Sequence, residues 1–490
     1  ALNAYVGPIL SDYLKALNKE LLSYDYKGVL LIMQSNGGVM APEVAEQFAA
    51  NTLPSGPAGG PTAGLFYANT HGVSNFITVD MGGTSFDACL VVDNKPVITT
   101  EGKVGGHQLA FPMINIHTVG AGGGSIAWID EGGLLQVGPK SAGADPGPIC
   151  YDRGGSEPTV TDADLLLGYL DPDFFFGGEF TLNVDLARRI LKEKVADPLH
   201  LDVIEAANGI YEIINAKMAD ALRVVSIEKG YDPREFALIV AGGAGPIHAG
   251  MIAKEIEIPM VIVPRESSVF CAAGMLFSDL KHDFVRTYTM SFDKLDAKEV
   301  SQLYDEMVAT AQKTLKAEGV RENRMKIEYS SDIRYVGQFN EVEVPITFKR
   351  NIENVHIQEM AKDFHRKHDQ LYGYSLPGAD LELINLRVAA YGITDKPTFT
   401  KAQRTQSSAT EALKGYRDAF FEGQFVKVPV YDGLKMEYGH SVSGPCIIEQ
   451  PTTTIIVPGE YALGCDEYNN YVMFHLELSS NEVKNKFGRV

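Results

Sequence analysis

Apolar residues recur at helical spacing in some stretches and gather in short runs in others, which predicts a mixed α/β chain. From Ile204 to Val225 they lie three or four positions apart, which predicts a long helix over 202–229, and Gly230 follows as a C-terminal cap would. Residues 4–23 predict another amphipathic helix. Residues 236–253 predict a buried strand, a glycine turn and the start of a helix, and 259–264 the next strand. Strands that alternate with helices indicate an α/β sheet.

The pattern changes near residue 286, where charged, surface-type helices and strand pairs replace the buried runs. A polar stretch follows, and short strands with turn residues fill the tail, as in a small β-domain. We therefore expect five regions: 1–75, an α/β lobe at 76–286, an α+β domain at 287–395, a linker at 396–410 and a β-rich C-terminal domain at 411–490.

Charge and composition exclude some functions. The chain has 490 residues, and its 63 acidic and 43 basic residues give a formal charge of -20. This argues against nucleic acids and anionic membranes as partners, because phosphate groups are held mainly by Lys and Arg. No run is long and apolar enough for a membrane span, and no signal peptide is evident. Five widely spaced cysteines without zinc or CxxC spacing are typical of reduced thiols in a cytoplasmic protein.

The most informative stretch is the turn VDMGGTSFD, which the pattern places in a β-hairpin. Gly82 and Gly83 allow positive φ and a close approach to another molecule. Successive N–H groups in such a turn form an anion-binding nest, and Thr84 and Ser85 add hydroxyl donors. The alternative is a hairpin turn that only needs its glycines.

Two acids flank that turn. Asp80 and Asp87 would repel a bare phosphate, but they fit if Mg²⁺ lies between them and the phosphate. The composition therefore suits a magnesium–nucleotide complex better than a free anion. For Asp87 the alternative role is to stabilise the turn.

A second glycine turn follows the strand at 236–241. Its residues are candidates for contacts with a nucleoside: Gly242, Gly243, Ala244 and Gly245. The alternative is close packing of the helix on the strand. A dinucleotide fingerprint would need a third glycine where His248 stands, and no Walker P-loop occurs.

The two turns are separated by roughly 160 residues that include a long helix. This arrangement resembles the superfamily of actin, sugar kinases and heat-shock chaperone ATPases. The resemblance implies two RNase-H-like sheets with flanking helices, with ATP in the cleft between them. It also implies that the hairpin binds phosphate and that the second turn cups the adenosine.

Several longer motifs narrow the resemblance. SGPAGG, VDMGGTSFD, HTVGAGGGSIAW, GYDPREFALIVAGGAGPIHA and DIRYVGQ occur in order, and together they resemble the hydantoinase A/5-oxoprolinase family. Related subunits of acetone and acetophenone carboxylases share these motifs. The match runs over nearly the whole chain.

The resemblance implies ATP with Mg²⁺ or Mn²⁺ as cofactors, with Asp80 and Asp87 as catalytic and metal residues. In the hydrolases ATP phosphorylates the oxygen of a cyclic amide, and in the carboxylases it activates a ketone and bicarbonate. We expect a subunit of a cytoplasmic cyclic-amide hydrolase acting on a small molecule in a hetero-oligomer. The alternatives are a ketone carboxylase subunit and a non-catalytic assembly subunit.

The resemblance also implies two partners: a subunit of the hydantoinase B type and a first ATPase lobe with its own Gly-Gly-Thr hairpin. The chain opens directly on a helix at Ala1 without a Met, so we expect it to be the middle of a longer protein, with 1–75 as the remainder of that first lobe.

Further residues are possible members of the cleft. Gln34, Ser35 and Asn36 follow a buried strand. Gly122, Gly123 and Gly124 form either a second anion nest or a loop at a subunit contact. His117 is either a general base or ligand or, as favoured, a structural histidine.

Other candidates have simpler explanations. Turn chemistry accounts for Asp145, Cys150 has no evident base partner, and His365 and His368 fit a solvated helix face better than a metal site.

Overall fold

The computed structural model describes residues 2–104, 106–109, 111–347 and 352–477. It divides into two compact units, each built from separate stretches of chain. Unit 1 combines 1–58, 98–114 and 275–397, and unit 2 combines 59–97, 115–274 and 398–490. Neither unit is one continuous segment, so this division does not test the expected domain boundaries. Those boundaries stay a prediction.

Unit 1 is built on a six-stranded sheet with the order β1-β2-β15-β18-β16-β17. Its strands are β1 (Ile32–Met33), β2 (Val39–Met40), β15 (Leu280–Ser291), β16 (Met325–Tyr335), β17 (Val342–Ile346) and β18 (Leu381–Gly392). Its helices are α1 (Leu2–Ser23), α2 (Pro42–Gln47), α10 (Ala297–Ala317) and α11 (Asn354–Tyr372). Short strand pairs are β6 (Ile98–Thr99) with β9 (Met113–Ile114) and β7 (Gly102–Val104) with β8 (His107–Leu109).

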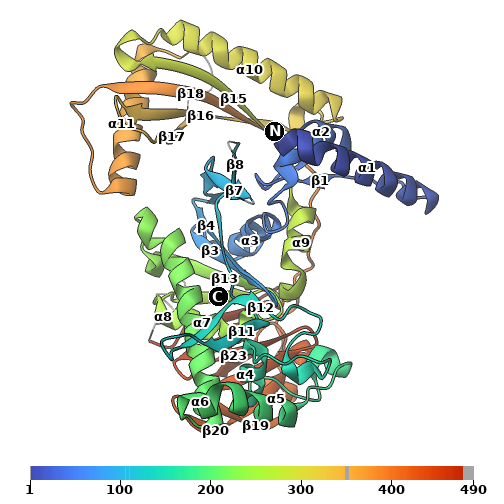
Figure 1. Ribbon diagram of the computed structural model, residues 1–490. Coiled ribbons are helices and arrows are strands. Elements are labelled where there is room, and N and C mark those ends of the chain that lie inside the picture. The colour runs from blue at the N-terminus through green and yellow to red at the C-terminus, as the bar shows by residue number, and fades with distance from the viewer. Residues whose placement is uncertain (1, 105, 110, 348–351, 478–490) are drawn as a thin grey trace. The chain divides into compact units, whose positions relative to one another are not determined.

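Alternating burial explains why this sheet carries helices. Along β18 the buried positions are mostly every second residue, which gives the sheet an apolar face. Helix α10 buries Val300, Tyr304, Met307, Ala311 and Leu315 at helical spacing and runs along the sheet (Figure 1). The Tyr304 hydroxyl donates to the Ser330 carbonyl of β16 at 2.7 Å. The charged helices and strand pairs predicted after residue 286 are confirmed by α10, α11 and the pairing of β16 with β17.

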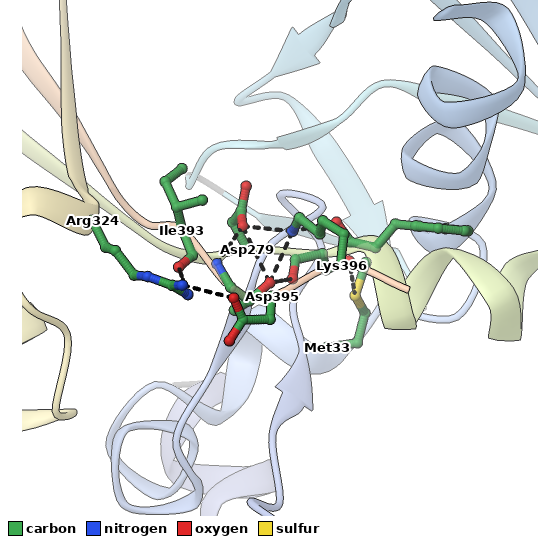
Figure 2. Close-up of polar contacts among 9 residues, drawn as sticks. Met33, Asp279, Arg324, Ile393, Asp395 and Lys396 are labelled. Atoms are coloured by element: carbon green, nitrogen blue, oxygen red, sulfur yellow. Dashed lines mark hydrogen bonds and ion pairs between the residues drawn. The ribbon is translucent and has the colours of Figure 1, made fainter. Parts of the chain in front are cut away.

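The two segments at which the chain enters and leaves unit 1 are tied to each other (Figure 2). Asp279 Oδ1 accepts hydrogen bonds from the Thr394 N–H at 2.8 Å and from Lys396 Nζ at 2.5 Å. Arg324 pairs with Asp395 at 2.7 Å beside them. These contacts tie the residue before β15 to the residues after β18, at the end of this strand pair where Leu280 lies opposite Gly392.

Unit 2 is built on a mixed nine-stranded sheet. The order is β10-β4-β3-β13-β14-β25-β24-β21, with β5 paired to β4. Its strands are β3 (Phe76–Met81), β4 (Phe86–Val92), β5 (Lys95–Pro96), β10 (Ile116–Val119), β13 (Ala237–Ala241), β14 (Met260–Val263), β21 (Ser441–Ser443), β24 (Tyr461–Cys465) and β25 (Tyr471–His475). The β3–β13 and β13–β14 pairs are parallel, whereas β3–β4 and β4–β10 are antiparallel.

Smaller elements complete unit 2. A four-stranded sheet holds β19 (Leu413–Phe421), β20 (Gln424–Asp432), β22 (Cys446–Gln450) and β23 (Thr453–Val457), and a pair holds β11 (Ser125–Ile129) and β12 (Leu135–Ser141). The helices are α3 (Gly59–Thr70), α4 (Val160–Leu166), α5 (Val184–Leu191), α6 (Asp197–Leu199), α7 (Val203–Val225) and α8 (Gly245–Glu255), and α9 (Phe270–Phe277) follows β14. Three strands of the tail therefore extend the large sheet, so the tail does not stand apart from the α/β lobe.

Helices pack on both faces of the large sheet. On one face, the apolar stripe of α7 packs against Ile77 and Val79 of β3. On the other face, Tyr67 of α3 packs against Phe76 of β3 and Phe270 of α9. The predicted helix at 202–229 is confirmed, although α7 ends at Val225 and Gly230 caps the short 3₁₀ turn that follows, with φ of 77°. No helix in the described residues is both long and apolar enough to cross a membrane.

A buried polar pair joins α4 to α8. The Asn215 amide donates to the Tyr211 carbonyl, so its oxygen faces His248 Nδ1 at 3.1 Å and that nitrogen must carry the proton. His248 Nε2 then lies 3.7 Å from Asp164 Oδ2, and neither Nε2 nor Asp164 Oδ1 has a hydrogen-bond partner in the described chain. Two buried acceptors repel each other unless a proton or a water lies between them.

This pair predicts different effects for two substitutions. Asp164→Asn supplies an N–H to His248 Nε2 and should leave the free energy of unfolding nearly unchanged. Asp164→Ala removes the oxygen that would share a proton or a water with His248 Nε2 and should lower the free energy of unfolding by about 1–3 kcal/mol. Urea unfolding of both variants measures the difference, and equal destabilisation by both would contradict the assignment.

Candidate functional site

The hairpin predicted around the VDMGGTSFD turn is present, and its two acids lie opposite each other. Asp80 of β3 is paired in register with Asp87 of β4, so both side chains lie on the same face of the sheet. The turn is closed by a hydrogen bond from the Gly82 N–H to the Ser85 carbonyl at 3.3 Å. Thr84 at its tip is exposed, and Ser85 is half-buried.

The two glycines of the turn differ from the expectation in one respect. Neither Gly82 nor Gly83 has positive φ, so the prediction of a left-handed backbone there is wrong. A Cβ added at either position would meet no atom within 4 Å. Their backbone therefore borders open space, which is the property that a close approach to another molecule requires.

The loop at 120–125 lies directly against this hairpin. The Gly123 and Gly124 N–H groups donate to the Gly82 and Gly83 carbonyls at 3.0 and 2.7 Å. The Gly122 N–H donates to Ser125 Oγ at 2.8 Å, and a Cβ at Gly122 would lie 2.5 Å from the Thr84 nitrogen. All three N–H groups are thus already hydrogen bonded, so the loop supports the hairpin and is not an open anion nest.

The second glycine turn also touches the hairpin. Gly242 has φ of 85°, and a Cβ there would lie 2.0 Å from the Met81 carbonyl oxygen and 2.7 Å from Asp80 Oδ1. The Ala244 N–H donates to the same Met81 carbonyl at 3.1 Å. Gly243 lies beside Thr452, and Thr453 Oγ1 donates to the Gly243 carbonyl at 2.9 Å. The two turns that the sequence singled out therefore meet in one place.

Both carboxylates are held by neutral donors. Cys271 Sγ donates to Asp80 Oδ2 at 3.1 Å, and Thr118 Oγ1 donates to Asp87 Oδ1 at 2.5 Å. Burial raises the pKa of Asp80, and the charge of Asp87 raises it further, while the Cys271 hydrogen bond opposes the shift. Burial likewise raises the pKa of Asp87, opposed by Thr118.

These two acids fit a divalent cation. Neither forms an ion pair with a Lys or Arg in the described part of the chain. No cluster of three or more metal-binding side chains occurs among the described residues, so the protein would supply two carboxylates and a ligand or water the rest. Mg²⁺ is commonly bound in this way, by one or two carboxylates together with phosphates.

The other predicted residues do not bond to the two acids. His117 pairs with Ala88, one position from the Thr118–Asp87 pair, so it lies on the opposite face of the sheet from Asp87. Gln34, Ser35 and Asn36 belong to unit 1, where all three are buried. There they bond to the Lys281 carbonyl, the Asn51 carbonyl and Asp283, respectively.

Sequence reasoning missed the donors to the two acids. Thr118 follows the singled-out His117 and could have been found from strand alternation, since it faces Asp87 across β4–β10. Cys271 stands in no motif and lies far from Asp80 in sequence, so only the tertiary structure shows it.

Two protein-family models match the chain, and together they span most of it. The Hydantoinase/oxoprolinase family matches residues 1–284, and the Hydantoinase/oxoprolinase C-terminal domain matches residues 291–478. The chain belongs to the hydantoinase/oxoprolinase family. The expected resemblance is thereby confirmed.

One relative of this chain is the caprolactamase subunit alpha of Pseudomonas jessenii. The two are 38% identical over 475 residues, which cover 96% of this chain and 68% of that one. The acetophenone carboxylase gamma subunit of Aromatoleum aromaticum is 33% identical, with 95% and 65% covered. The 5-oxoprolinase 1 of Arabidopsis thaliana is 30% identical to this chain. The match covers 98% of this chain but only 38% of that protein.

Solved structures give the same result for this family member. The crystal structure of ATP-dependent caprolactamase from Pseudomonas jessenii matches with a TM-score of 0.89 at 37% identity, over 96% of this chain and 69% of that one. The nucleotide-free structure of acetone carboxylase matches with a TM-score of 0.75 at 25% identity, over 94% and 66%. The family therefore includes hydrolases and carboxylases, several of them named as subunits.

The glycines of the site predict opposite responses to alanine. Gly122→Ala places a methyl group against the Thr84 backbone and should lower the free energy of unfolding by about 1–3 kcal/mol. Gly83→Ala meets open space at an ordinary φ, so it should cause no loss and a gain of up to about 1 kcal/mol. Urea unfolding of the two variants tests this, and a loss of stability in Gly83→Ala would contradict the open geometry.

Proposed function

We propose that this chain is the nucleotide-binding part of an ATP-dependent enzyme that opens cyclic amides. The observation that carries the proposal is the contact between the hairpin and the Gly242–Gly245 turn, beside two carboxylates that form no ion pair with a Lys or Arg among the described residues. Gly82, Gly83, Thr84 and Ser85 would face the phosphates, and the second turn would hold the adenosine. Asp80 and Asp87 would hold Mg²⁺ or Mn²⁺.

The strand order supports the finer fold assignment. In β10-β4-β3-β13-β14, the first three strands are antiparallel and the next two are parallel to β3. This is the order expected of an RNase-H-like sheet, as in actin-like ATPases. Fold alone does not define chemistry, so the proposal depends on the site and on the relatives.

The reaction proposed is transfer of the γ-phosphoryl group to the amide oxygen. The oxygen attacks the γ-phosphorus, the bond to the β-phosphate oxygen breaks, and ADP leaves with that electron pair. Water then adds to the activated carbon, the ring C–N bond breaks, and phosphate is released. Catalysis of phosphoryl transfer is mainly positioning and charge stabilisation, and a bound Mg²⁺ would neutralise charge on the phosphates.

A hydantoinase-B-type partner and a further ATPase lobe with its own Gly-Gly-Thr hairpin would complete the enzyme. The relatives named as alpha and gamma subunits support a partner, and the chain spans about two thirds of their length. A ketone carboxylase subunit is the second candidate, favoured by the 33% identity to acetophenone carboxylase. A non-catalytic assembly subunit is the third.

A substrate test separates these candidates. ATP turnover by the full-length protein with its partner should rise with a lactam, hydantoin or 5-oxoproline, and not with a ketone plus bicarbonate. Asp80→Asn should reduce turnover at least about tenfold, since loss of even an indirect partner of a metal costs 10–100-fold. Glu193→Gln, at an exposed carboxylate of the same unit, is the matched control. Stimulation only by ketone plus bicarbonate would favour the carboxylase, and no nucleotide binding would favour the assembly subunit.

The raised pKa values predict a pH dependence. Cation binding needs both carboxylates ionised, so Mg-ATP affinity should fall as pH drops through the raised pKa values, above the usual Asp value of about 3.9. Without ligand the sign is opposite: a raised carboxyl pKa in the folded state means that stability falls as pH rises from the unfolded to the folded value. At pH values above that range, Asp80→Asn should therefore raise the melting temperature of the free protein. The same substitution should weaken the binding of Mg-ATP. Calorimetry of both quantities against pH tests it, and a lower melting temperature would count against buried, uncompensated charge.

A further inference from the structure

A cysteine thiol contacts the acid at the centre of the proposed site. Cys271 lies in the first turn of α9, and its Sγ is 3.1 Å from Asp80 Oδ2. The other carboxylate oxygen, Oδ1, lies beside the backbone of Gly242. Asp80 therefore lies between α9, whose Cys271 donates a hydrogen bond to it, and the turn that contains Gly242.

Close packing of two helices brings the thiol to this position. A Cβ at Gly59 would lie 2.2 Å from the Cys271 carbonyl oxygen, and one at Gly274 would lie 1.9 Å from the Gly59 carbonyl oxygen. A Cβ at Gly60 would lie 3.4 Å from Cys271 Sγ. Only glycines permit backbone contact this close between α3 and α9. The SGPAGG motif thus has a role that nucleotide contacts do not explain.

The direction of the hydrogen bond follows from the thiol's surroundings. Burial raises the pKa of Cys271 well above its usual range, and the charges of Asp80 and Asp87 raise it further. A thiol S–H can donate and a carboxylate oxygen can accept, so at 3.1 Å Cys271 is the donor and Asp80 Oδ2 the acceptor. Cys271 is one of five free cysteines, and the other four are buried.

We propose that Cys271 is a positioning residue for the reaction at the hairpin: its S–H···O bond fixes the Asp80 carboxylate in the orientation that the cation requires. This role rests on the proposed function. The negative charge of Asp87 repels the Asp80 carboxylate and favours other orientations of it. A neutral donor on a rigid helix holds the carboxylate in place without neutralising the charge that binds the cation. A Lys or Arg in place of Cys271 would fix the orientation but cancel the charge.

The bond itself is tested by infrared spectroscopy, which needs no activity. The difference spectrum between wild type and Cys271→Ala isolates one S–H stretching band, and Cys446→Ala gives the band of a buried thiol in β22 as reference. We expect the Cys271 band at lower frequency than the reference, and a shift to higher frequency in Asp80→Asn. A Cys271 band that does not respond to Asp80→Asn would overturn the hydrogen bond.

Its role in the reaction is tested by kinetics of the full-length protein with its partner. Cys271→Ala should lower kcat about tenfold with little change in KM, as loss of a residue that orients a metal ligand does. The acid limb of the pH profile should move to higher pH, because the lost hydrogen bond no longer opposes the raised pKa of Asp80. Cys271→Ser keeps a donor and should restore both properties, whereas Cys446→Ala should change neither.

The outcomes separate this inference from the proposed function. If Cys271→Ala turns over ATP with the wild-type kcat and pH profile, the positioning role is wrong while the nucleotide site stands. If the wild type binds no nucleotide, the proposed function fails and the role fails with it, although the infrared shift would still show the bond. A loss in Cys271→Ala that serine does not rescue would indicate packing alone and also overturn the role.

Discussion

The site depends on the parallel pairing of β3 with β13. In its register Ala241 lies opposite Asp80, so the two strands end side by side although they are far apart in sequence. The turn after each strand then emerges at the same edge of the sheet, where Met81 accepts a hydrogen bond from Ala244. A shift of β3 by one residue against β13 would turn Asp80 to the opposite face of the sheet and away from the Gly242 turn. The long apolar stripe of α7 and the core around Ile77 fix this register, and thereby the site.

Glycines serve two different purposes around these turns. Gly122 and Gly242 allow backbones within the protein to touch, as the short distances from an added Cβ show. Gly82 and Gly83 border open space and are free to meet another molecule. The same residue type therefore marks both internal packing and an accessible surface. Only the second kind argues for a ligand, and among the glycines of the two turns and the 120–125 loop it is found at Gly82 and Gly83.

Local patterns were sufficient for the helices, the hairpin and the second turn, because each depends on neighbours in sequence. Contacts between distant segments were not predictable in this way. Nothing in the sequence indicates that the tail extends the sheet of the α/β lobe through β25, which pairs with β14. The donor to Asp80 was missed for the same reason, since Cys271 reaches it only through the crossing of two helices. The singled-out His117 lies on the far face of the sheet, which strand alternation requires once Thr118 faces Asp87.

Two facing carboxylates held by neutral donors are an unfavourable arrangement for stability alone. Burial and like charge both oppose ionisation, and an arginine or lysine nearby would relieve this at once. Neither acid pairs with an arginine or lysine among the described residues. A cation that binds together with a ligand would explain this arrangement. Such a site would bind phosphate and a metal ion, and glycine N–H groups cannot distinguish an amide from a ketone. Relatives named for caprolactam, acetophenone and 5-oxoproline align along nearly the whole chain, so their choice of substrate must depend on side chains outside the hairpin and its neighbouring turn.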